Sequence, residues 1–156
     1  MKKRILFICL GNICRSPSAE AIMKYYVKER GLEGQYYIDS AGISGYHSGD
    51  PADRRMQSHA IRRGYDLTSL SRKFYPDADF SDFDMIIGMD DRNIDDLREL
   101  APSPEEEKKI YRMCDFSVKK VVDYVPDPYY GGDSGFENVL DILEDTCGGL
   151  LEMLRK

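Results

Sequence analysis

A cysteine and an arginine with five residues between them stand near the start of the chain, at Cys9 and Arg15. Gly11 and Asn12 between them are typical of a tight turn, and Ser16-Pro17 is typical of the start of a helix. Successive backbone N–H groups in such a turn, placed before a helix N-terminus, bind anions such as phosphate. A thiolate at Cys9 could then attack phosphorus while the Arg15 guanidinium holds two phosphate oxygens. The spacing thus indicates nucleophilic chemistry on a phosphate ester.

The spacing alone is weak evidence for an anion-binding loop, because a cysteine and an arginine so placed also occur by chance. The segments on either side of the loop supply stronger evidence. Residues 5–9 are nearly all apolar, as in a parallel strand that is covered on both faces. The loop therefore joins a buried strand to a helix, and no other cysteine of the chain has an arginine at this distance. We favour the anion-binding loop over the alternative, a buried cysteine that happens to precede a surface arginine.

The order of apolar runs and helical patterns predicts how the loop is positioned. Strands alternate with helices, which is typical of one α/β domain, here residues 1–156, with a mostly parallel sheet. Ligands of such sheets bind at the carboxyl ends of strands, where Cys9 lies. The expected strands are 36–40, 85–89 and 110–114 besides 5–9, and the expected helices are 16–30, 52–63, one that ends near 100, and 135–154.

Composition excludes several classes of function. With a net charge of -6 the chain is a poor candidate for nucleic-acid or anionic-membrane binding, and it has no apolar run long enough to span a bilayer. The four cysteines show no metal-ligand spacing, so we expect no metal, no cofactor and free thiols in a reducing, cytoplasmic environment. We expect these acidic residues to be solvated: Asp77, Asp79, Asp82, Asp84, Asp90, Asp91, Asp95 and Asp96.

Four stretches of the sequence resemble the low-molecular-weight protein tyrosine phosphatases. They are Ile8 to Pro17, Asp39-Ser40-Ala41-Gly42, Met89-Asp90 and Asp127-Pro128-Tyr129-Tyr130, and they span nearly the whole chain. The resemblance implies a four-stranded parallel sheet with helices on both faces and a phosphate-binding loop after the first strand. It also implies hydrolysis of protein phosphotyrosine through a cysteinyl-phosphate intermediate.

The resemblance further implies roles for individual residues. Cys9 would be the nucleophile, Arg15 the phosphate clamp and Asp127 the general acid and base, although Asp-Pro by itself would indicate no more than a turn. Ser40 would support the loop, and His47 would lie beside the wall of the substrate slot. The expected substrate-binding residues are Leu10, Gly11, Asn12, Ile13, Cys14 and Ser16 of the loop, with Tyr46 and Tyr129 as walls.

Alternatives of the same fold are a phosphoarginine phosphatase and an arsenate reductase. Ile13 and Tyr129 favour an aryl phosphate over phosphoarginine, because phosphoarginine phosphatases of this kind tend to carry Thr and Phe there. An arsenate reductase wants a closely spaced redox pair, unlike Cys114 and Cys147. A non-catalytic phosphate-binding module would need no thiol at Cys9.

The expected partner is a phosphotyrosine-containing protein, and a cognate tyrosine kinase is a further candidate. Two questions stay open at the level of sequence. Cys14 either packs the loop or forms a protective disulfide with Cys9 upon oxidation. Tyr129 and Tyr130 are candidate acceptors of a phosphoryl group.

Overall fold

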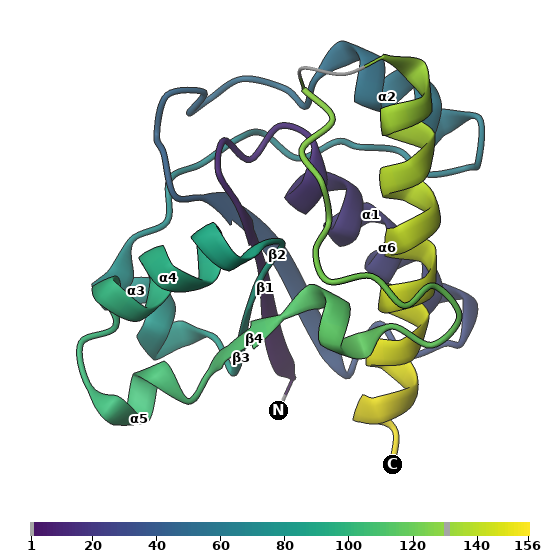
Figure 1. The fold of residues 1–156 in the computed structure, drawn as a ribbon. Helices are drawn as coiled ribbons and strands as arrows, with labels where there is room; N and C mark the ends of the chain where they lie inside the picture. Colours follow the sequence, from purple (N-terminus) through teal and green to yellow (C-terminus); the bar gives the residue numbers. More distant parts are fainter. Residues whose placement is uncertain (1, 130–131) are drawn as a thin grey trace.

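A four-stranded, all-parallel sheet forms the centre of the protein, with the strand order β2-β1-β3-β4 (Figure 1). This computed structural model describes residues 2–129 and 132–156, so Tyr130 lies outside the described residues. The strands are β1 (Lys3–Cys9), β2 (Tyr36–Gly42), β3 (Met85–Gly88) and β4 (Ile110–Arg112). All four predicted strands are present, although β4 ends two residues early because the chain turns into a short 3-10 helix at Met113.

Helices connect the strands and account for most of the remaining chain. The expected helices are confirmed within a few residues, whereas α3 and α5, which both begin at a proline, were not predicted. The last helix continues through Gly148-Gly149, and the absence of a side chain at Gly149 permits close packing, since a Cβ there would lie 1.9 Å from the Phe116 carbonyl oxygen. The helices are α1 (Arg15–Glu29), α2 (Arg54–Ile61), α3 (Pro76–Asp82), α4 (Asp91–Leu100), α5 (Pro104–Glu107), η1 (Met113–Phe116) and α6 (Asp133–Leu154).

The central strand β1 is apolar on both faces, and helices cover each of them (Figure 1). Ile5 and Phe7 lie in the core that α1 and α6 contribute, whereas Leu6 and Ile8 lie in the core that α3 and α4 contribute. This alternation follows from the pleat, which turns successive side chains to opposite faces. The predicted arrangement of helices on both faces is confirmed.

The carboxyl end of β1 lies at the opposite end of the sheet from the two chain termini (Figure 1). Cys9, the last residue of β1, is paired in register with Gly42, the last residue of β2. A Cβ on Gly42 would come within 3.0 Å of backbone atoms of Gly11, Leu10 and Ser44. The carboxyl end of β2 and the loop after Cys9 are therefore in direct backbone contact.

Candidate active site

The loop between β1 and α1, residues 10–14, is held by hydrogen bonds to its carbonyl oxygens. On the side of β2, Ile43 N–H donates to Cys9 O at 3.0 Å and Ser44 N–H donates to Leu10 O at 2.8 Å. The Ser71 hydroxyl lies 3.0 Å from Gly11 O and 2.8 Å from Asn12 O. Further along the loop, Asp53 N–H donates to Ile13 O at 2.8 Å and Ser18 N–H donates to Cys14 O at 3.2 Å.

These contacts determine where the N–H groups of the loop point. A trans peptide unit places its N–H opposite its C=O. Because the carbonyls from Cys9 to Cys14 are turned toward surrounding elements, the N–H groups of residues 10–15 are turned to the other side. Converging N–H groups before a helix N-terminus can bind an anion.

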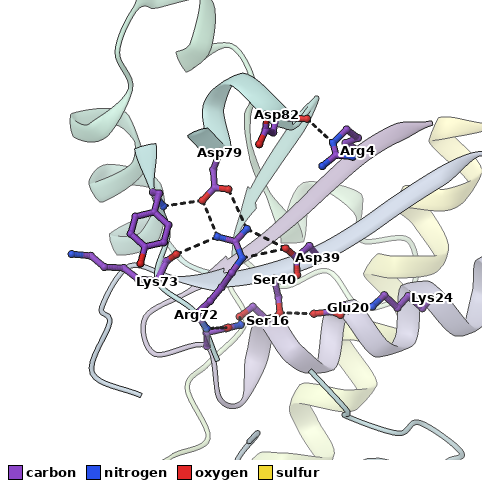
Figure 2. Close-up of polar contacts among 12 residues, drawn as sticks. Arg4, Ser16, Glu20, Lys24, Asp39, Ser40, Arg72, Lys73, Asp79 and Asp82 are labelled. Carbon is purple, nitrogen blue, oxygen red and sulfur yellow. Dashed lines mark hydrogen bonds and ion pairs between the residues drawn. The ribbon is translucent and has the colours of Figure 1, made fainter. Parts of the chain in front are cut away.

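The sulfur of Cys9 lies at the base of this loop and contacts a buried hydroxyl. Cys9 Sγ is 3.0 Å from Ser16 Oγ, and the amide of Asn12 donates to Ser16 Oγ at 2.8 Å and to Ser40 Oγ at 3.0 Å. Ser40 in turn donates to the buried carboxylate of Glu20 at 2.6 Å (Figure 2). Cys9 is therefore connected through side chains of α1 and β2 to a carboxylate that the sequence analysis did not single out.

Arg15 is buried, and its guanidinium is fixed by neighbouring oxygens. Its Nη1 donates to Asp90 Oδ2 at 2.7 Å and to Val125 O at 3.0 Å, and its Nη2 lies 3.8 Å from Asp127 Oδ2. Burial works against its charge, but the charges of Cys9 and Asp90 outweigh burial and raise the pKa of Arg15 above its usual value. The side chain is a permanent cation with a fixed orientation.

The carboxylate of Asp127 lies beside Arg15, although Asp127 belongs to the loop before α6, far along the chain. The backbone of this loop is joined to the sheet where Val125 N–H donates to Met89 O at 2.8 Å. Asp127 Oδ1 accepts from Tyr129 N–H at 3.0 Å, which leaves the other oxygen toward Arg15. The carboxylate is about one third exposed, so it can exchange protons with water.

A cavity of about 310 Å³ lies over these groups. Tyr46, His47 and Tyr129 form its aromatic wall, where His47 stands edge-on to Tyr46 at 4.9 Å between ring centroids. Cys9, Arg15 and Asp127 line the same cavity as this aromatic wall. The cavity is lined by Cys9, Leu10, Gly11, Ile13, Cys14, Arg15, Ser44, Tyr46, His47, Asp127 and Tyr129.

Known proteins are similar to this chain in both sequence and architecture. A family model described as low molecular weight phosphotyrosine protein phosphatase matches residues 4–156. The chain belongs to this phosphatase family. A putative low molecular weight protein-tyrosine-phosphatase from Synechocystis is 46% identical, with 98% of this chain and 97% of that protein covered. The low molecular weight phosphotyrosine protein phosphatase of Homo sapiens is 38% identical, with 96% and 94% covered.

Solved structures of known phosphatases are also similar to this chain in fold. A protein tyrosine phosphatase from Entamoeba histolytica, solved with Hepes in its active site, superposes with a TM-score of 0.95 at 45% identity and covers 99% of this chain and 97% of that one. A structure described as drosophila arginine phosphatase superposes with a TM-score of 0.91 at 33% identity and covers 100% and 99%. The expected fold, family and enzyme class are confirmed.

The phosphatase brings nearly all of its predicted site residues together. Asn12 and Ser16 do not line the cavity, because their side chains are buried behind the loop and support it. The expectation of solvated acidic residues was wrong for Asp79 and Asp90: Asp79 is 5% exposed and binds Arg72, and Asp90 binds Arg15.

The other cysteines of the phosphatase differ from Cys9 in their surroundings. Burial raises the pKa of Cys14, with smaller contributions from Asp53 and Cys9, so its thiol is neutral at pH 7. Burial also raises the pKa of Cys114 to about 11 and that of Cys147 still further. All four cysteines are free. Within residues 2–129 and 132–156 there is no group of three metal-binding side chains, and no helix there is both long and apolar enough to cross a membrane.

Proposed function

We propose that this phosphatase hydrolyses protein phosphotyrosine through a phosphocysteine at Cys9. The observation that carries the proposal is the convergence of Cys9, Arg15 and Asp127 on one cavity with an aromatic wall. A phosphate in the loop would meet backbone N–H groups, and Arg15 could hold two of its oxygens. The ring of phosphotyrosine would lie against Tyr46 and Tyr129.

In the first step the Cys9 thiolate attacks phosphorus and the bond to the tyrosine oxygen breaks. Asp127 gives its proton to the leaving oxygen, since a phenolate is a poor leaving group without one. Arg15 stabilises the charge that spreads over the transferring phosphoryl group. The first product is the tyrosine side chain, and Asp127 is left as a carboxylate.

In the second step water attacks the phosphocysteine and Asp127 takes up a proton from that water. The sulfur–phosphorus bond breaks, inorganic phosphate is released, and the thiolate of Cys9 returns. A hydrogen bond from the Ser16 hydroxyl, 3.0 Å away, stabilises the departing thiolate.

The substrate partner in this proposal is a phosphotyrosine-containing protein, and a kinase that phosphorylates the same protein would be its counterpart. Four free thiols fit a reducing compartment, so we place the enzyme in the cytoplasm. Phosphoarginine is the second candidate substrate, because one structural relative is described as an arginine phosphatase. Arsenate reduction is disfavoured, since Cys114 and Cys147 are buried and neither lines the cavity.

The test is hydrolysis of a phosphotyrosine peptide and a phosphoarginine peptide under reducing conditions by wild type and Cys9→Ser. We expect turnover of phosphotyrosine by the wild type and a loss of more than about 10³-fold in the variant, because a hydroxyl at this position is a far weaker nucleophile. Cys114→Ser, which changes a buried thiol outside the cavity, is the matched control and should keep its activity. No turnover by folded wild type would refute the proposal, and faster turnover of phosphoarginine would establish the alternative.

A further inference from the structure

Asn12, in the middle of the Cys9 loop, has an unusual backbone conformation. Its φ is 57°, and within the described residues no other non-glycine residue has a positive φ. Such a conformation costs free energy, so the surroundings must hold it in place. The segment Ser71-Arg72 does so from outside the loop. The Ser71 hydroxyl contacts the carbonyls of Gly11 and Asn12, and Arg72 N–H donates to Asn12 Oδ1 at 3.0 Å.

The contact from Arg72 determines which way the Asn12 amide faces. A backbone N–H can only donate, so the atom that it meets must be the amide oxygen. The Asn12 NH₂ group therefore points to the opposite side, where Ser16 Oγ and Ser40 Oγ lie at 2.8 and 3.0 Å. Both of those hydroxyl oxygens act as acceptors.

The direction of these hydrogen bonds continues to the nucleophile. Because Ser16 Oγ accepts from Asn12, its own hydrogen is available for Cys9 Sγ at 3.0 Å. Ser40 likewise accepts from Asn12 and gives its hydrogen to Glu20 at 2.6 Å. One polarised series thus runs from Arg72 N–H through Asn12 and Ser16 to the sulfur, and a hydrogen bond donated to a thiolate favours the charged form.

Arg72 itself is fixed by two carboxylates from different elements (Figure 2). Its Nη1 and Nη2 bind the two oxygens of Asp79 at 3.0 and 3.1 Å, and its Nε and Nη2 bind Asp39 Oδ2 at 3.2 and 3.1 Å. Asp79 also accepts from Tyr75 N–H at the start of α3. Burial alone would lower the pKa of Arg72, but its hydrogen bonds to Asp79 and the charge of Asp39 raise the pKa, so Arg72 is permanently charged.

Arg72 links the Cys9 loop to strand β2 through Asp39 and to helix α3 through Asp79. Asp39 and Ser40 are consecutive residues of β2, and the pleat turns their side chains to opposite faces of the sheet. Asp39 holds Arg72, which supplies the N–H for the Asn12 oxygen, while Ser40 accepts from the Asn12 nitrogen. Ser40 therefore binds the nitrogen of the Asn12 amide directly. Its neighbour Asp39 fixes the oxygen of the same amide through Arg72.

We propose that Arg72, anchored by Asp39 and Asp79, is a positioning residue that acts through Asn12 to keep the Ser16 hydroxyl donating to Cys9. The inference rests on the proposed function in so far as Cys9 is the nucleophile. Without the anchor, the Asn12 amide is free to turn its oxygen toward Ser16. The Ser16 hydrogen then goes to that oxygen, and the Cys9 thiolate loses its donor.

The test is Arg72→Gln, which keeps the backbone N–H and removes the anchor. Its first readout is the rate at which iodoacetate alkylates Cys9 at pH 6, located by mass spectrometry, because the thiolate is the form that reacts. We expect this rate to fall about tenfold, the size of losing one hydrogen bond to a charged group. The second readout is hydrolysis of an aryl phosphate. Here kcat should fall by a similar factor while KM changes less than about twofold, since no group that touches substrate is altered.

Asn12→Asp separates this route from a general loss of structure. The substitution keeps an oxygen for Arg72 N–H and replaces the NH₂ donor, so it should lower the alkylation rate as well. If Arg72 acts through Asn12, adding Arg72→Gln to Asn12→Asp should have little further effect, because the two substitutions remove the same interaction. If the losses of alkylation rate caused by the two single substitutions instead multiply in the double variant, the proposal is overturned.

Arg4→Gln is the matched control. Arg4 Nε donates to Asp82 O at the end of the same helix α3 (Figure 2). Arg4 also contacts Tyr37, where the guanidinium lies 4.1 Å from the ring centre, and residues 83 and 84, away from the Cys9 loop. The variant should leave alkylation and kcat unchanged. If Cys9 of the Arg72→Gln variant is alkylated at the wild-type rate, the proposal is also overturned. Because alkylation needs no turnover, it stays informative even where no hydrolysis is found, an outcome that refutes the proposed function alone.

Discussion

Two loops face each other across the cavity, and the protein holds them in different ways. The Cys9 loop is bonded through its carbonyls to surrounding elements along its whole length, and Asn12 and Ser16 behind it are buried. The loop of Asp127 is joined to the sheet at the buried Val125. Beyond that point it is more exposed, and Tyr129 O accepts a hydrogen bond at 2.8 Å from Arg55, whose side chain is about half exposed.

The difference corresponds to two tasks. Donors that stabilise a transition state must be in place before the reaction, because any movement toward it costs free energy. A general acid needs access to water so that it can be reprotonated, and it must reach leaving groups of different shape. We therefore expect changes in the Cys9 loop to slow all substrates alike, and changes at Asp127 to act according to the leaving group.

The largest effect that would sharpen this comparison is expected from Asp127→Asn. The variant should lower kcat for phenyl phosphate by about 10² to 10⁴, because the phenolate must leave without a proton. The loss should be much smaller for p-nitrophenyl phosphate, whose leaving group is a weaker base. Steady-state rates for the two esters, measured side by side, give the ratio directly.

The pH dependence of the same variant supplies the check. For the wild type we expect a bell-shaped rate profile with its optimum on the order of pH 5 to 6, since the acid must be protonated while Cys9 is ionised. Asparagine does not ionise, so the fall on the alkaline side should disappear in the variant. If that fall persists, another group is the acid.

A smaller effect is expected from Gly42→Ala at the edge of the Cys9 loop. The added Cβ would press on backbone atoms of Gly11, Leu10 and Ser44 at 3.0 Å and displace the loop by a few tenths of an ångström. Such a displacement should lower kcat roughly tenfold, and for both esters by the same factor. Gly34→Ala is the control, since its Cβ meets nothing within 4 Å. Unequal losses of kcat for the two esters would contradict the expectation that changes in the Cys9 loop slow all substrates alike.

The sequence predicted the Cys9 side of the cavity better than the rest, for a physical reason. The apolar run 5–9, the Gly-Asn turn and the Ser-Pro helix start are neighbours in the chain, so their patterns report local structure. Asp127 lies far along the chain, and it was found through the family resemblance. The same resemblance identified Tyr46 and Tyr129, which now line the cavity.

The residues that the sequence analysis missed are polar side chains whose partners are distant in sequence. Asp79 and Asp90 stand among many acidic residues, and nothing local distinguishes a carboxylate that binds Arg72 or Arg15 from one that faces water. Glu20 lies in a helix whose pattern accounts for its apolar residues alone. These contacts arise when the sheet brings β2 and β3 beside β1, which no pattern within one segment records.

The smallest predicted effect concerns the helix that follows the Asp127 loop. Glu137 in the first turns of α6 binds Arg63 at 2.7 Å and also contacts His59, whose ring stacks on Phe136. The hydrogen bond from Arg63, followed by that from His59, lowers the pKa of Glu137. A carboxyl with a lowered pKa contributes stability above its unfolded value of about 4.3, and that contribution is lost as the pH falls through the lower folded value.

Glu137→Gln tests whether the helix that follows the Asp127 loop depends for its stability on the contacts of Glu137 with Arg63 and His59. Between pH 5 and pH 3 we expect the melting temperature of the wild type to fall by about 1 to 2 °C more than that of the variant, a small difference because the pair is largely solvated. The control is Glu105→Gln, which changes an exposed partner of Lys108 at 3.5 Å and should lose stability as the wild type does. Parallel falls for wild type and Glu137→Gln would mean that the contacts of the Glu137 carboxylate with Arg63 and His59 add no pH-dependent stability.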